Sequence, residues 1–219
     1  MTEKQQQIID ETADFVKETL QGAESGHDWW HVQRVWKTAK TIAEKEEADE
    51  FVVELGALLH DIADSKFHDG NEEIGPIVAR RHLESLAVEP GVIEQVEAII
   101  RNISYKNSLS GNKYHSSEFD IVQDADRLDA IGAIGIARTF NYGGHINAEI
   151  YNPEILPRTG LTEEEYKGSR SPTLNHFYEK LLLLKDKMNT KAGRKLAEDR
   201  HFFMERFLIQ FYKEWDSDL

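Results

Sequence analysis

Histidine and aspartate side chains of the kind that bind metal ions occur at three separate places in this chain of 219 residues. His60 and Asp61 end an apolar run that begins at Phe51, while His31 lies upstream and Asp126 far downstream. Charged side chains are rarely buried unless they are paired or bind a metal, and imidazole with carboxylate suits divalent metals. We therefore predict that His31, His60, Asp61 and Asp126 hold one divalent ion, with Mn, Co, Ni, Fe and Mg as the candidates.

The pattern of apolar residues around these ligands indicates that they face the protein interior. His31 shares a helix face with Val35, and Asp126 lies on a largely apolar helical segment where a carboxylate without a metal or partner would be costly to bury. Each ligand also has a structural interpretation that the sequence leaves open. His31 would then be an ordinary core histidine, His60 and Asp61 the end of a helix, and Asp126 the ion-pair partner of Arg127 or Arg34.

Helices must bring these side chains together, and the chain is helical in pattern throughout. Apolar residues recur with a period near 3.6, and no convincing alternation of the strand type is found. We predict helices over residues 4–20, 28–47, 50–63, 72–86, 90–104, 118–140, 173–188 and 190–215. The longest irregular stretches are 104–117 and 141–172, and such loops are often functional. The predicted fold class is all-α.

Composition limits the classes of partner. The formal net charge of −14 repels a nucleic-acid backbone, which excludes double-stranded nucleic acid but leaves small phosphorylated molecules open. The chain has no cysteine, which excludes disulfides and thiolate metal sites. No apolar run approaches the roughly 18 residues of a transmembrane helix, and the first residues lack the pattern of a signal peptide. We therefore expect a cytoplasmic protein with no membrane partner.

Three motifs in this chain resemble those of the HD-domain metal-dependent phosphohydrolases, a family with the pattern His, His-Asp and a distant Asp. The motifs cover residues 26–34, 58–62 and 124–128, and the similarity continues through 127–133 and 172–180. It points to a small bacterial subgroup similar to nucleotide pyrophosphohydrolases. The resemblance implies a single HD-type helical bundle over residues 1–219, with a core at about 20–140 and a C-terminal helical extension at about 141–219 packed on it.

The same resemblance implies hydrolysis of a phosphate ester or anhydride. We expect a nucleotide or another small phosphorylated substrate, with cleavage of a nucleoside triphosphate to monophosphate and pyrophosphate as the specific reaction. Asp61 and Asp64 are the expected catalytic residues: Asp61 would act as a metal ligand, and Asp64 would act as general base or orient the attacking water. Guanosine tetraphosphate hydrolases of this fold carry Glu-Asp where this chain has Asp64 and Ser65, which argues against that activity.

Phosphoryl chemistry needs positive charge and hydrogen-bond donors around the transferred group. We expect four side chains to contact the substrate: Lys66, Lys106, His27 and Arg34. For the two lysines, the alternative is an ordinary solvated surface cation.

Three further hypotheses stay open from the sequence. A metal-stabilised module would bind nucleotide without turning it over. A dinuclear phosphodiesterase or di-iron oxygenase of the same fold would need His82 and His115 as extra ligands, although both lie in segments that look exposed. The apolar faces of the last two helices would serve either a homodimer or the core.

Overall fold

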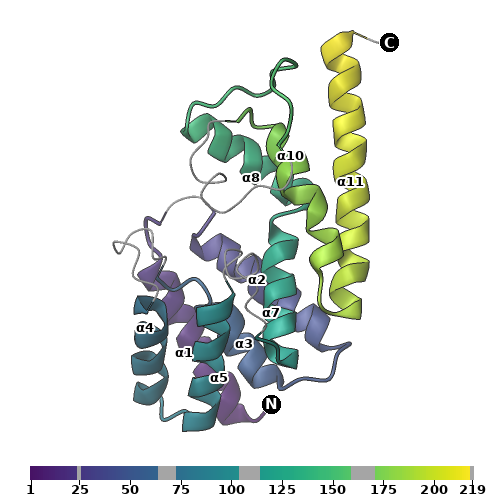
Figure 1. Ribbon diagram of the computed structural model, residues 1–219. Helices are drawn as coiled ribbons and strands as arrows, with labels where there is room; N and C mark the ends of the chain where they lie inside the picture. The colour runs from purple at the N-terminus through teal and green to yellow at the C-terminus, as the bar shows by residue number, and fades with distance from the viewer. Residues whose placement is uncertain (24–25, 64–72, 104–113, 159–170, 218–219) are drawn as a thin grey trace. The chain divides into compact units, whose positions relative to one another are not determined.

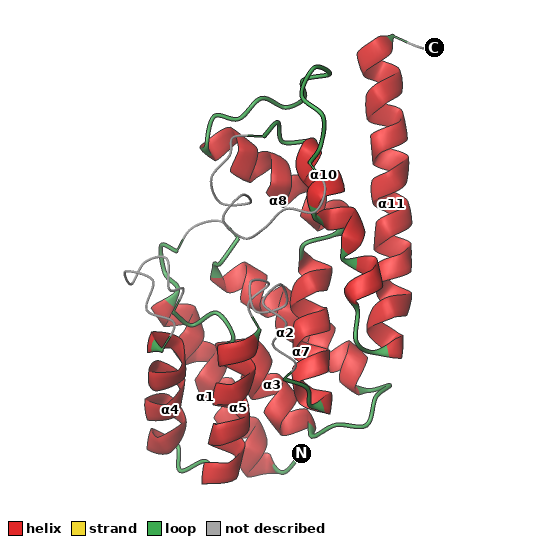
Figure 2. Cartoon of the chain, in the orientation of Figure 1, coloured by secondary structure: helices red, strands yellow, loops and turns green. Residues whose placement is uncertain are grey.

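The structure is a computed structural model that describes residues 1–23, 26–63, 73–103, 114–158 and 171–217 (Figure 1). Within these ranges all regular elements are helical, as Figure 2 shows, and this confirms the predicted all-α class. The chain forms two compact units, Met1–Asp126 and Arg127–Leu219. The prediction of one HD-type domain with a helical extension stays a prediction. No helix among the described residues is both long and apolar enough to cross a membrane.

The N-terminal unit is built around one helix that is buried from its second residue onward. It contains α1 (Glu3–Thr19), α2 (Trp29–Ala43), α3 (Glu50–Leu59), α4 (Ile74–Ser85) and α5 (Pro90–Asn102), and α7 (Ser117–Asp129) begins in it. Helix α3 contacts α1, α2 and α5, and every one of its residues from Phe51 to Leu59 is buried. Because a helix covered on all sides is apolar all round, the continuous apolar run of the sequence is explained.

An aspartate caps the N-terminus of both α2 and α3. Asp28 is the N-cap of α2, and its carboxylate accepts a hydrogen bond from the backbone N–H of His31 at 2.9 Å. Asp49 caps α3 in the same way through the N–H groups of Phe51 and Val52. These caps satisfy backbone donors that have no partner inside the helix. They fix where each helix begins, and therefore which face each later side chain occupies.

The predicted helix over 118–140 is wrong in one respect, because the structure divides it in two. Helix α7 ends at Asp129 and α8 runs from Gly132 to His145, into a stretch that the sequence pattern predicts to be irregular. Ile131 is extended and Gly132 has a φ of 75°, a conformation that favours glycine. A side chain at Gly135 would also collide with the carbonyl oxygen of Ala130, 2.2 Å from its Cβ position. The break therefore rests on two glycines inside an otherwise helical pattern.

The C-terminal unit packs aromatic side chains between α8, α10 (Asn175–Glu179) and α11 (Lys191–Asp216). Phe177 is fully buried and its ring is stacked on Phe207 at 5.8 Å, with Phe140 6.0 Å from the first ring. The predicted helix over 173–188 is only the short α10 followed by two 3-10 turns, η2 (Leu181–Leu183) and η3 (Lys185–Lys187). The interruption is at Lys180, whose φ of −143° is not helical.

Candidate metal centre

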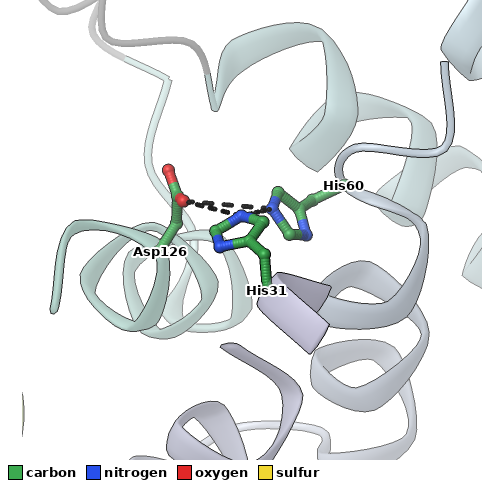
Figure 3. Close-up of side chains that lie close together, drawn as sticks. All are labelled: His31, His60 and Asp126. Carbon is green, nitrogen blue, oxygen red and sulfur yellow. Dashed lines mark hydrogen bonds and ion pairs between the residues drawn. The ribbon is translucent and has the colours of Figure 1, made fainter. Parts of the chain in front are cut away.

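Three predicted metal ligands lie together in the N-terminal unit, as Figure 3 shows. His31 comes from the first turn of α2, His60 is the C-cap of α3, and Asp126 lies on α7. The two Nε2 atoms of the histidines are 3.3 Å apart. The Oδ1 atom of Asp126 is 3.5 Å from Nε2 of His31 and 3.9 Å from Nε2 of His60. Donor atoms that share an ion at about 2.1 Å from each lie roughly 3–4 Å apart, so this set fits one divalent ion.

The position of the proton on the His60 ring also suits a metal ligand. Its Nδ1 atom lies 2.8 Å from the backbone oxygen of Ala57. A carbonyl oxygen only accepts hydrogen bonds, so the proton is on Nδ1, and in the neutral ring Nε2 carries the lone pair that points toward His31. The side chains of both histidines are almost fully buried, at 2% and 3% exposed. A hydrogen bond of this kind orients a ligating histidine, and no sequence signal marks Ala57 as its acceptor.

Asp61 lies beside this group. Its Oδ2 atom is 2.5 Å from Nδ1 of His27 and 3.9 Å from Nε2 of His31. Burial raises the pKa of Asp61, but the hydrogen bond with His27 and the nearby histidines outweigh burial and hold that pKa well below its usual range. Asp61 is therefore an anion at the edge of the group, and its role as a fourth ligand stays a prediction. The sequence pattern indicates His27 as a substrate contact but does not reveal its pairing with Asp61.

The other predicted site residues divide into two sets. His27 is about one-third exposed, and Arg34 is half-buried on α2 one turn after His31. Three lie outside the described residues: Asp64, Lys66 and Lys106.

Two residues near Asp126 have other partners. Asp129 lies 2.6 Å from the guanidinium of Arg138, which neutralises it without a metal. Arg127, the proposed alternative partner of Asp126, donates a hydrogen bond to the backbone oxygen of Lys187. Of this acidic stretch, Asp126 is the residue that contributes to the three-ligand group.

The two histidines that a dinuclear site would need are placed elsewhere. His82 is half-buried, stacked on Phe15 at 4.0 Å, with Nε2 3.1 Å from the hydroxyl of Thr12. The sequence interpretation of His82 as solvent-facing is therefore wrong, and burial lowers the pKa of its imidazole. His115 is 61% exposed and lies 3.0 Å from Asp120. Among the described residues, one group of three or more potential metal ligands has its donor atoms close together, and it is the group shown in Figure 3.

Comparison with known proteins gives consistent matches over nearly the whole chain. The family model of the HD domain matches residues 29–131. The YpgQ protein of Bacillus subtilis is 39% identical over 201 residues, which are 91% of this chain and 90% of that protein. Among solved structures, an HD-superfamily hydrolase from Bacillus thuringiensis is 45% identical with a TM-score of 0.79, covering 98% of this chain and 100% of that one. YpgQ in complex with ADP is 35% identical with a TM-score of 0.76, covering 96% of each chain.

Proposed function

Because the chain belongs to the HD-domain family, within a subgroup that includes Bacillus subtilis YpgQ, we propose that it is a divalent-metal-dependent phosphohydrolase. The observation that carries the proposal is the pair of buried Nε2 atoms of His31 and His60, 3.3 Å apart beside the carboxylate of Asp126. Two imidazole lone pairs and an anion in one place repel each other unless a cation or a proton lies between them. A divalent ion satisfies all three donors at once.

In this proposal His31, His60 and Asp126 hold the ion, and Asp61 completes the set. A bound divalent ion supplies Lewis-acid polarisation of a phosphoryl group and makes water more acidic. Ala57 keeps the proton of His60 on Nδ1, so Nε2 stays available as a ligand. His27, about one-third exposed, holds the Asp61 carboxylate in place through the 2.5 Å contact between Nδ1 and Oδ2.

We propose a nucleotide as the substrate, and cleavage of a nucleoside triphosphate to monophosphate and pyrophosphate as the reaction. The complex of the relative YpgQ with ADP supports a nucleotide ligand. His27 and Arg34 are the proposed substrate contacts among the described residues, because both lie within about one turn of His31 on or next to α2. Lys66 and Lys106 are proposed as further contacts from the sequence alone, with Asp64 as the residue that orients the attacking water.

The test is turnover of chelator-stripped protein on nucleoside mono-, di- and triphosphates with Mn, Mg, Co or Ni, with the products identified. We expect metal-dependent release of monophosphate and pyrophosphate from triphosphates, reduced at least about 100-fold in an Asp126→Asn variant. Asp120→Asn is the matched control, because Asp120 lies on the same helix and outside the three-ligand group. Release of orthophosphate would contradict the proposed bond but not the phosphohydrolase. Absence of turnover with metal bound would favour a nucleotide-binding module instead.

A further inference from the structure

The first turn of α2 exposes an indole beside a ligand of the candidate metal centre. Trp30 directly precedes His31, the histidine that α2 contributes to the group in Figure 3. Trp30 is 60% exposed, whereas His31 is buried. Among the described residues of the N-terminal unit, two other large apolar side chains are exposed, Met1 at the start of the chain and Ile77 on α4. Trp30 is therefore an exposed aromatic surface at the position next to a predicted metal ligand.

The helix that carries Trp30 is basic, although the chain as a whole is acidic. The formal net charge of the chain is −14. Helix α2, from Trp29 to Ala43, contains three cations and no acidic residue, and the cations are Arg34, Lys37 and Lys40. Local cations attract an anion even where the overall field of the protein repels it. The composition of α2 therefore favours an anionic ligand on this helix.

Helical spacing places a cation next to both the indole and the metal ligand. Arg34 is three residues after His31 and four after Trp30, so its Cβ atom lies about 5–6 Å from the Cβ atom of each. Lys37 is seven residues after Trp30, two turns further along the same face. On the surface of α2, Arg34 therefore borders the buried histidine on one side and the exposed indole on the other.

We propose that Trp30 forms a nucleobase subsite, in which the base of a bound nucleotide stacks on the exposed indole while its phosphates lie at Arg34 and the metal centre. This inference rests on the proposed function and adds the residue that recognises the nucleoside. The metal centre and Arg34 bind phosphate, which a nucleotide and inorganic diphosphate share, so these groups do not distinguish the two. An aromatic ring stacks on any base, because every base has a π-face. The subsite therefore selects nucleotides over inorganic phosphates and accepts more than one base.

The neighbours of Trp30 on its helix face argue against a protein partner as the occupant. A tryptophan that anchors a protein interface is surrounded by further contacts that exclude water. The residues three, four and seven positions after Trp30 are polar instead: Gln33, Arg34 and Lys37. The ammonium group of Lys37 lies 3.5 Å from the amide oxygen of Gln33, a neutral partner that leaves its charge in place. One flat ring beside positive charge is the combination that binds a base together with its phosphates.

Two ligands that differ only in the nucleoside test the subsite: α,β-methylene-ADP and methylenediphosphonate. Neither can be hydrolysed at its P–C–P bridge, so calorimetric titration of the full chain loaded with Mn²⁺ measures binding without turnover. We expect Trp30→Ala to weaken binding of the nucleotide analogue about tenfold and to leave the affinity for methylenediphosphonate unchanged. Trp215→Ala is the matched control, because Trp215 is 49% exposed on α11, and it should change neither affinity. Circular dichroism melts establish that each variant is folded.

Tryptophan fluorescence separates stacking from an indirect effect of the substitution. A base stacked on Trp30 quenches its indole, so α,β-methylene-ADP should reduce the emission of the wild type more than methylenediphosphonate does. Trp30→Phe keeps an aromatic face, so it should bind the nucleotide analogue within about threefold of the wild type and lose this quenching. Equal weakening of both ligands in Trp30→Ala, no weakening of either, or quenching that persists in Trp30→Phe would overturn the base subsite and leave the metal centre standing. If the Mn²⁺-loaded protein bound neither ligand, the proposed function would fail at its phosphate site, and the base subsite with it.

Discussion

Glu54 connects α3 to α2, the two helices that carry the histidines of the candidate metal centre. Its side chain is only 3% exposed and accepts a hydrogen bond from the indole N–H of Trp36 at 2.7 Å. The ammonium group of Lys40, itself 44% exposed, lies 3.1 Å from the same carboxylate oxygen. Removing Glu54 therefore breaks a charge-assisted hydrogen bond and an ion pair between the two helices, and leaves a small void.

The three contributions to stability differ in size. A hydrogen bond to a charged group contributes about 1.5–3 kcal/mol, and the lost methylenes add about 1 kcal/mol. The ion pair with half-exposed Lys40 contributes at most about 1 kcal/mol, because water screens it. We therefore expect Glu54→Ala to lower the free energy of unfolding by about 3 kcal/mol. Glu54→Gln, which keeps an acceptor for Trp36, should cost about 1 kcal/mol.

The assay is urea-induced unfolding followed by circular dichroism for wild type, Glu54→Ala, Glu54→Gln and Lys40→Ala. The order of stability should be wild type, then Lys40→Ala and Glu54→Gln close together, then Glu54→Ala well below. If Glu54→Gln costs as much as Glu54→Ala, the charge rather than the indole hydrogen bond is what holds the helices, and the reasoning is refuted. A loss below about 0.5 kcal/mol in Glu54→Ala would refute it as well.

Three further predictions concern the C-terminal unit. Gly132→Ala should lower stability by about 1–2 kcal/mol in thermal melts, because the φ of Gly132 is 75° and a Cβ there meets a neighbouring side chain at 3.0 Å; an unchanged melting temperature would contradict this. Gly143→Ala should lower stability by about 1–3 kcal/mol, since its Cβ would lie 2.2 Å from the hydroxyl of Thr173. Chemical denaturation should show part of that loss recovered in a Thr173→Ala background, and equal losses in both backgrounds would disprove the contact. Burial, followed by the charge of Lys180, lowers the pKa of His176 to about 4 from its ordinary value of 6.5. The unfolded chain therefore takes up this proton first, and up to about 3 kcal/mol of stability is lost as pH falls from 6.5 to about 4. His176→Asn should show a shallower pH dependence of urea unfolding over that window, and an identical slope would refute the assignment.

The amino-acid sequence by itself is enough to place His31 and Asp126 on helices and His60 at the end of a helix, and to predict that the two histidines are buried. The helical period around His31 and the apolar run preceding His60 both indicate interior positions, and both histidines are buried. Spacing along the chain carries no information about hydrogen bonds that form only when distant segments meet. It therefore does not indicate that the Asp61 carboxylate faces His27, or that a backbone oxygen orients His60.

The errors in the predicted fold have a common cause. The period of apolar residues continues across the junction of α7 and α8, so it predicts one helix there. The helix is interrupted at this junction because Gly132 has a positive φ, and the period of apolar residues carries no information about backbone dihedral angles. His82 shows the same limit, because its charged neighbours in sequence suggest exposure, whereas Phe15 and Thr12 from a distant helix cover it.

We propose above that His31, His60 and Asp126 bind a divalent metal ion. The most direct measurement is the anomalous scattering of crystals grown with Mn²⁺, which locates the ion independently of any assay of turnover. We predict one strong peak within about 2.3 Å of both Nε2 atoms and of the Asp126 carboxylate. A peak at another place, or none at a manganese concentration that supports phosphohydrolysis, would contradict it.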